Sequence, residues 1–137
     1  MTHDNYVSAA AAYYEYKLAQ FGATPAGVDW NSEASQQLRF DQLFRCVSPT
    51  WPSSIRSVND YGCGYGALTD HLERLGFSGE YRGYDASPKM IEAAARDHSG
   101  RGRHFTSDRR ALEVADLTVA SGIFNVKLQA TDEAWWE

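Results

Sequence analysis

The stretch Val58-Asn59-Asp60-Tyr61-Gly62-Cys63-Gly64-Tyr65-Gly66-Ala67-Leu68 decides the fold of this chain. It overlaps the end of a predicted strand, Ile55–Tyr61, and leads through a Gly-x-Gly-x-Gly turn into a predicted helix, Ala67–Leu75. A strand, a glycine-rich turn and a helix together present backbone N–H groups at a helix N-terminus, where an anion or a polar group can bind. The spacing differs from the Gly-x-Gly-x-x-Gly of dinucleotide-binding turns. Taken alone, such a turn is also compatible with an ordinary loop.

The three glycines and a later acid together make a ligand site the better interpretation. Gly62 allows a tight turn, Gly64 lets a ligand lie against bare backbone, and Gly66 permits close packing between helix and strand. Asp85 ends the next predicted strand, about 20 residues further on, where a carboxylate can accept hydrogen bonds from both ribose hydroxyls of a nucleoside. The alternative is that Asp85 caps the helix that begins just after it.

Strands and helices alternate along the rest of this region. After the strand Tyr81–Asp85, Ser87 and Pro88 are typical of a helix start, with serine as N-cap and proline at the first helical position. Two further strands are predicted at Arg103–Thr106 and Leu117–Ala120. This alternation predicts an α/β fold with a parallel sheet and helices on its faces.

The N-terminal part of the chain is predicted to be helical. Apolar and aromatic residues recur at helical spacing from Tyr6 to Phe21, and a second helix begins near Asn31 or Ser32 and runs to about Cys46. Ser48–Ser53 contains two prolines and is predicted to be a linker. We therefore expect a helical cap over residues 1–50 and a cofactor-binding core over 51–137, together forming one structural domain.

Composition excludes several classes of protein. The 137 residues are 43% hydrophobic and 23% charged, which is typical of a globular domain. A net charge of -5 argues against broad binding to nucleic acid. The two cysteines, Cys46 and Cys63, are too few for a disulfide framework or a zinc site, so no metal is expected. No signal peptide or membrane span is visible, and we expect a cytoplasmic protein without membrane partners.

The quoted stretch 58–68 resembles the first motif of the class I S-adenosylmethionine-dependent methyltransferases, whose fold is Rossmann-like. Residues 84–91, Tyr-Asp-Ala-Ser-Pro-Lys-Met-Ile, resemble the second motif. Phe105–Asp108 and Ala115–Phe124 are similar to the third and fourth. The resemblance covers roughly residues 55 to 125 and implies S-adenosyl-L-methionine as cofactor and methyl transfer as activity.

The resemblance also implies a role for each matching residue. Asp60 would hold the methionine amino group, Asp85 the ribose, and Asp108 the adenine amino group. Ala86 or Met90 would pack on adenine. Met90 as helix core and Asp108 as a loop carboxylate are the alternative interpretations. The expected cofactor-binding residues are Asp60, Gly62, Cys63, Gly64, Asp85, Ala86, Met90, Asp108 and Ser121.

No residue can be assigned to catalysis from the sequence, because methyl transfer from a sulfonium mainly requires alignment of the reactants. His71 is expected at the surface, and His98 and His104 have no distinguishing feature. Arg109 and Arg110, with two nearby arginines, are expected in a solvated connection. Candidates for contact with a small-molecule acceptor are Tyr13, Tyr14, Tyr16, Lys17, Trp30, Arg39, Asn125 and Lys127.

The chain is expected to end before the last strands of the family fold. The fourth strand would then be an open, apolar sheet edge. Three interpretations stay open: a fragment of a longer methyltransferase, a short form completed by a second copy or a partner, and a non-catalytic S-adenosylmethionine-binding module. A missing C-terminal segment or a homodimer would each cover the edge.

Overall fold

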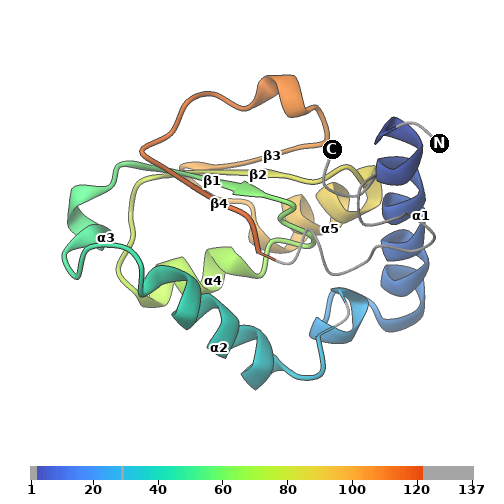
Figure 1. The fold of residues 1–137 in the computed structure, drawn as a ribbon, viewed down its shortest axis with the longest axis horizontal. Helices are drawn as coiled ribbons and strands as arrows, with labels where there is room; N and C mark the ends of the chain where they lie inside the picture. Colours follow the sequence, from blue (N-terminus) through green and yellow to red (C-terminus); the bar gives the residue numbers. More distant parts are fainter. Residues whose placement is uncertain (1–2, 29, 122–137) are drawn as a thin grey trace.

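The computed structural model describes residues 3–28 and 30–121, which form a parallel sheet with helices packed against it (Figure 1). The helices and strands follow one another as α1 (His3–Phe21), the 3-10 helix η1 (Pro25–Val28), α2 (Glu33–Phe44), α3 (Trp51–Ser54), β1 (Ser57–Tyr61), α4 (Leu68–Arg74), β2 (Glu80–Tyr84), α5 (Pro88–His98), β3 (Arg103–Thr106), the 3-10 helix η2 (Arg109–Ala111) and β4 (Leu117–Val119). The predicted strands and long helices are confirmed, with ends that differ by a few residues.

The described sheet has four strands in the order β3-β2-β1-β4, and every neighbouring pair is parallel. The chain moves outward from β1 through β2 to β3 and then returns to the opposite side of β1. This reversal makes β1 and β4 neighbours at a topological switch point, and ligands of open α/β sheets bind beyond the carboxyl ends of the strands there. Among the described strands, β4 is paired on one side only.

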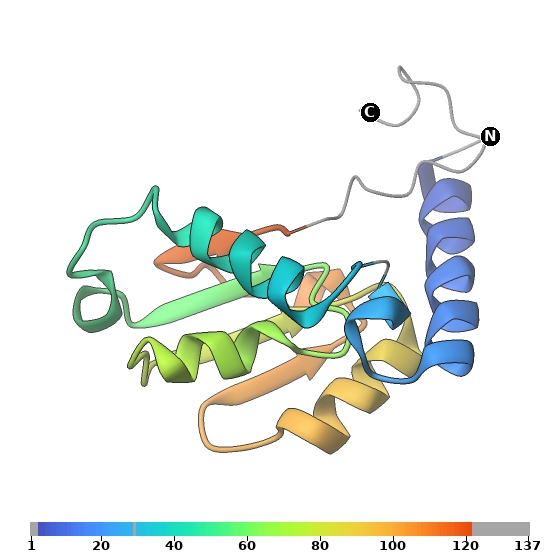
Figure 2. The same ribbon diagram turned by 90° about the horizontal axis from the view of Figure 1, so that it is seen from below.

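Helices α2, α4 and α5 cover one face of the sheet, as the view from below shows (Figure 2). The segment that carries η2 crosses the other face (Figure 1). Helix α1 stands at the end of the sheet toward which the strands point, and this places it over the switch point (Figures 1 and 2). The Rossmann-like arrangement with an N-terminal helical cap is thus confirmed.

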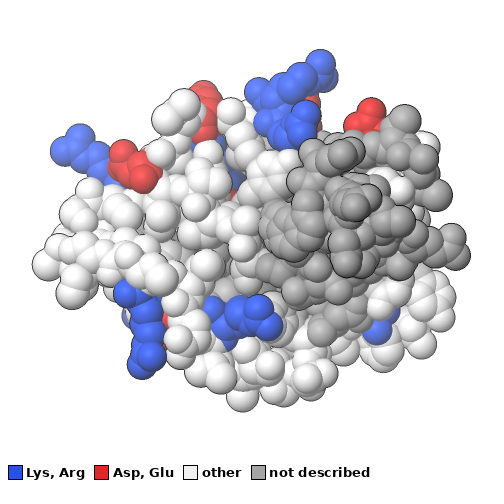
Figure 3. Space-filling model, in the orientation of Figure 1, with Lys and Arg blue, Asp and Glu red and all other residues white. Residues whose placement is uncertain are grey.

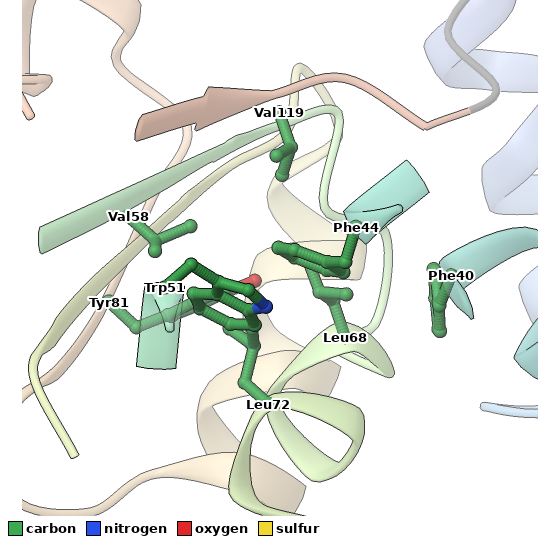
Figure 4. Packing of buried hydrophobic residues seen from close by; sticks show 8 residues of the cluster. All are labelled: Phe40, Phe44, Trp51, Val58, Leu68, Leu72, Tyr81 and Val119. Carbon is green, nitrogen blue, oxygen red and sulfur yellow. The ribbon is translucent and has the colours of Figure 1, made fainter. Parts of the chain in front are cut away.

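A hydrophobic core lies between helices α2, α3 and α4 and the face of the sheet that α2, α4 and α5 cover (Figure 4). The side chain of Trp51 stacks on Phe44 with the ring centroids 4.6 Å apart. The prediction of a plain linker over Ser48–Ser53 is wrong in this respect, since Trp51 starts the short helix α3 and is 5% exposed. Burying a tryptophan provides enough apolar contact to order a segment whose prolines alone suggest a loop.

Serine side chains begin two of the helices. Ser32 accepts a hydrogen bond from the backbone N–H of Ser35, and Ser87 accepts one from Met90. Ser87 is the predicted cap, and Ser32 lies where the second helix was predicted to begin, because an N-cap depends only on residues within one turn. No helix among the described residues is long and apolar enough to cross a bilayer.

Candidate functional site

A cavity of about 470 Å³ opens at the carboxyl ends of β1 and β2, beneath α1. Its size lies within the range of small-molecule sites. Helix α1, the glycine-rich turn, the turn after β2 and the segment around η2 all contribute to its wall. All of the residues expected to bind the cofactor line it, namely Asp60, Gly62, Cys63, Gly64, Asp85, Ala86, Met90, Asp108 and Ser121.

The glycine-rich turn adopts backbone conformations that suit glycine. Gly62 and Gly64 have φ values of 81° and 55°, in the region that other residues rarely adopt. The N–H groups of Gly62 and Cys63 both donate to the carbonyl oxygen of Tyr84, at 2.8 Å, which ties the turn to the end of β2. A Cβ atom on Gly64 would lie 3.2 Å from a methyl group of Val28, so the turn also sits close to η1.

Gly66 has a different place from the other two glycines. It does not line the cavity, and its φ is 88°. A Cβ atom there would lie 3.0 Å from the His98 ring and 3.2 Å from the Phe105 ring. Its expected role in close packing between helix and strand is therefore confirmed.

The carboxylate of Asp85 links the glycine-rich turn to the start of α5. Its Oδ2 accepts from the N–H of Gly64 and its Oδ1 from the N–H of Ser87, both at 2.9 Å. Burial raises the pKa of Asp85 even though these two bonds act in the opposite direction. The helix that follows is capped by the Ser87 hydroxyl, which also donates to Glu15 of α1 at 3.0 Å. Asp85 therefore holds the glycine turn beside the cavity, and Ser87 is the cap.

Asp60 is a nearly fully buried carboxyl group at the end of β1. It is 3% exposed, and its Oδ2 accepts a hydrogen bond of 2.7 Å from the hydroxyl of Tyr81 on β2. Burial raises the pKa of Asp60 to about 7, with the Tyr81 hydrogen bond opposing the rise and the nearby Asp85 adding to it. The group can therefore gain or lose a proton near neutral pH.

The remaining expected residues add both apolar and polar groups to the cavity wall. Met90 is 1% exposed and packs with Tyr65, so it belongs to the core and to the cavity wall at once. Asp108 caps η2 and accepts from the backbone N–H of Arg110 at 3.0 Å. The buried hydroxyl oxygen of Ser121 has no hydrogen-bond partner among the described residues. It is available to a ligand in the cavity.

Several residues at the rim bear on acceptor binding. Tyr14 and Trp30 line the cavity, and the guanidinium of Arg39 lies 4.8 Å from the centre of the Trp30 ring. Tyr16 is 65% exposed and does not line the cavity. Asn125 and Lys127 lie outside the described residues.

Arg109 and Arg110 lie in an exposed connection after β3, as predicted, and they also line the cavity. Both are exposed, and Arg110 forms an ion pair with Asp108. Basic side chains gather at the upper edge of the face in Figure 3, where Figure 1 places η2. The prediction missed their position at the cavity because it depends on how the segment after β3 crosses the sheet.

The prediction that His71 lies at the surface is wrong. Its side chain is buried between α2 and α4, with Nδ1 2.8 Å from Oε1 of Gln37 and Nε2 3.4 Å from a carboxylate oxygen of Asp41. Burial lowers the pKa of His71. The ring packs against Phe40 with centroids 5.4 Å apart, so this histidine belongs to the helix–helix interface.

No histidine whose side chain the structure describes lines the cavity. Nδ1 of His98 lies 3.3 Å from a carboxylate oxygen of Asp70, and Nε2 of His104 lies 2.9 Å from a carboxylate oxygen of Glu80. No group of three or more histidine, cysteine or acidic side chains within the described ranges could hold a metal ion. The polar groups that line the cavity therefore include carboxylates, hydroxyls, backbone groups and the guanidinium groups of Arg109 and Arg110.

Two buried polar pairs at the site were missed by sequence reasoning. One joins Tyr81 to Asp60, and the other joins the Tyr65 hydroxyl to the Gln36 side chain at 3.1 Å. Each pair links residues far apart in the chain. Neither pair has a signal within a short window of sequence, because each depends on how distant elements pack.

A family model for a methyltransferase domain matches residues 58–136 of this chain. The chain belongs to this methyltransferase domain family. Rv1506c of Mycobacterium tuberculosis, a protein named as a methyltransferase, is 50% identical to it over 80 residues. That match covers 58% of this chain and 48% of Rv1506c, so the chain spans about half the length of this relative.

Solved methyltransferase structures share the fold. StiE O-MT residues 942-1257 match with a TM-score of 0.51 at 25% identity, covering 62% of this chain and 32% of that one. The plantazolicin methyltransferase BamL, solved with a triazolic desmethylPZN analog and SAH, matches with a TM-score of 0.52 at 17% identity. Its match covers 84% of this chain and 47% of BamL. At that identity the similarity shows the fold.

Proposed function

We propose that this chain is the cofactor-binding part of an S-adenosylmethionine-dependent methyltransferase whose acceptor is a small molecule. The observation that carries the proposal is the position of Asp85. Its carboxylate lies at the carboxyl end of β2, bonded to the glycine turn, on the wall of the cavity at the switch point of the sheet. Membership of the methyltransferase domain family supports this ligand.

The groups around the cavity fit the chemical groups of S-adenosylmethionine. Asp85 has lone pairs beyond its two backbone bonds and would accept from the ribose hydroxyls. Asp60 would accept from the ammonium group of the methionine part, and the pair of carboxylates suits a ligand that carries an ammonium and a sulfonium. Ala86 and Met90 offer apolar surface for the adenine ring, with Asp108 close enough to line the same cavity.

In methyl transfer from a sulfonium, the main contribution of the protein is to align the reactants. S-adenosylmethionine, when bound, would supply a methyl group already activated by its sulfonium, and transfer of that group to an acceptor lone pair would leave a neutral thioether. The side chains of Tyr14 and Trp30 provide an aromatic wall toward α1 for the acceptor. A cavity of about 470 Å³ has the size of a small-molecule site, which supports a small molecule as the acceptor.

Isothermal titration calorimetry with S-adenosylhomocysteine tests the binding step. We expect binding to the unmodified chain and an affinity lower by about ten- to a hundredfold in Asp85→Asn, because a charge-assisted hydrogen bond is lost. Asp97→Asn is the matched control, since Asp97 is exposed, pairs with Arg96 and does not line the cavity. A folded chain that releases no heat with S-adenosylhomocysteine would refute the proposal.

Release of S-adenosylhomocysteine in the presence of candidate acceptors tests the enzymatic step. We expect turnover with small nucleophiles and not with RNA or protein. Tight cofactor binding without turnover over all acceptor classes would instead identify the chain as a binding module.

A further inference from the structure

The hydrogen bond between Tyr81 and Asp60 joins the two central strands inside the protein. The Tyr81 side chain is 2% exposed, and its hydroxyl donates to Oδ2 of Asp60 at 2.7 Å. In the sheet register Asp60 lies opposite Gly83, and Tyr81 lies opposite Val58, so the tyrosine reaches Asp60 along the diagonal. Diagonal neighbours on one face of a sheet are within reach of long aromatic side chains.

The position opposite Asp60 cannot be taken by a larger residue. A Cβ atom on Gly83 would lie 2.9 Å from Sγ of Cys63 and 3.0 Å from the Phe105 ring. On the other side of β1, Asp60 lies opposite the apolar Val119 of β4. Asp60 therefore has Gly83 and Val119 as its neighbours on the two adjacent strands, and the Tyr81 hydroxyl is its hydrogen-bond donor among the described side chains.

No described cation neutralises Asp60. The charged or titratable groups that act on it are Tyr81 on β2, Cys63 in the glycine turn and Asp85 after β2. Burial raises the pKa of both Tyr81 and Cys63, so these groups stay neutral. Asp85 is an acid and disfavours a second negative charge nearby. The Tyr81 hydrogen bond is thus the contact that favours the ionised form of Asp60.

We propose that Tyr81 is a positioning residue, whose hydroxyl holds the Asp60 carboxylate ionised and oriented for the ammonium group of the ligand. This inference rests on the proposed function, since the ammonium belongs to the methionine part of S-adenosylmethionine. Tyr81 is not among the residues that line the cavity, so it acts through Asp60.

The pH dependence of binding follows from this arrangement. An ammonium group binds the carboxylate and not the neutral acid, so binding below about pH 7 drives a proton off Asp60. The affinity then falls about tenfold for each pH unit below that midpoint. Without the Tyr81 hydroxyl the midpoint moves upward by about one to two pH units, because the ionised form has lost its donor.

Binding of S-adenosylhomocysteine to the full chain, measured by calorimetry between about pH 5.5 and pH 9, tests the proposal. We expect the ratio of dissociation constants, Tyr81→Phe over wild type, to be about ten or more near pH 6 and to approach one near pH 9. Taking the ratio cancels the titration of the ligand itself. The same comparison is made in the Asp60→Asn background. There, the ratio of dissociation constants with and without Tyr81→Phe should not depend on pH.

Tyr65→Phe is the matched control, because it removes a buried hydroxyl that bonds to Gln36 and not to Asp60. Any loss of affinity in this variant should be the same at every pH. A folded Tyr81→Phe protein whose ratio is also flat would overturn the proposal, since that is what a purely structural role predicts.

Carbon-13 NMR of the ligand-free chain gives a second readout. We expect the Asp60 Cγ resonance to titrate near pH 7 in the wild type and at higher pH in Tyr81→Phe. If that variant does not fold, the Tyr81 Cζ resonance of the wild type decides, because it should follow the Asp60 midpoint. A Tyr81 resonance that stays constant would overturn the inference, whereas wild-type protein that shows both titrations but binds no S-adenosylhomocysteine would overturn only the proposed function.

Discussion

Replacing Asp60 with asparagine should stabilise the fold at neutral and alkaline pH while it weakens ligand binding. In the folded chain burial raises the pKa of Asp60 from 3.8 to about 7. Between these two values the unfolded chain ionises its aspartate and the folded chain keeps the proton. The folded state therefore binds more protons, and the free energy of unfolding falls as the pH rises through this window. Above about pH 7 the loss is complete and the curve becomes level.

The size of the effect follows from the shift. A difference of about three pH units corresponds to about 4 kcal/mol, which is an upper estimate for a single buried group. Asparagine has nearly the same shape, can accept the Tyr81 hydrogen bond through its amide oxygen, and has no charge to bury. The stability difference between Asp60→Asn and wild type should thus be small near pH 4 and should grow to about 2–4 kcal/mol at pH 8.

Urea denaturation of both proteins at about pH 4.5, 6 and 8, followed by circular dichroism, measures this difference. Glu92→Gln is the control, since Glu92 is an exposed acid on α5 that does not line the cavity. The reasoning is refuted if Asp60→Asn has the same stability difference at pH 4.5 and pH 8, or if it destabilises the fold more strongly as the pH rises.

Two further substitutions test the packing around the site. Gly66→Ala should destabilise the fold by about 2–4 kcal/mol, because its φ is 88° and the new methyl group would press against the His98 ring. Gly76→Ala is the control, and it should cost only about 1 kcal/mol, because Gly76 has a similar φ of 84° but open space around it. Thermal unfolding of the two variants checks this, and equal losses would contradict it. Trp51→Ala should cost about 3–5 kcal/mol through the loss of its stacking on Phe44, and a loss below about 1 kcal/mol in urea denaturation would show that α3 is not part of the core.

Much of the fold could be predicted from the chain because the signals are local. The Ser87 cap acts on Met90 within one helical turn, and the strand Arg103–Thr106 is found at its predicted bounds. The short helix α3 was missed because its stability comes from burying Trp51 against α2, a contact that no short window of sequence contains. The surface position predicted for His71 was wrong for the same reason, since the burial of this histidine depends on the packing of α2 against α4.

The glycine-rich turn and Asp85 were sufficient in the sequence alone to indicate a backbone-lined site for a nucleoside-bearing ligand, because strand, turn and helix are each specified over a few neighbouring residues. Only the tertiary structure decided what surrounds that site. The pairing of β1 with β2 brings the Tyr81 hydroxyl to Asp60, and the return of the chain to β4 brings Ser121 to the same cavity. These contacts join residues distant in sequence, so they arise from the order and register of the strands and not from local propensity.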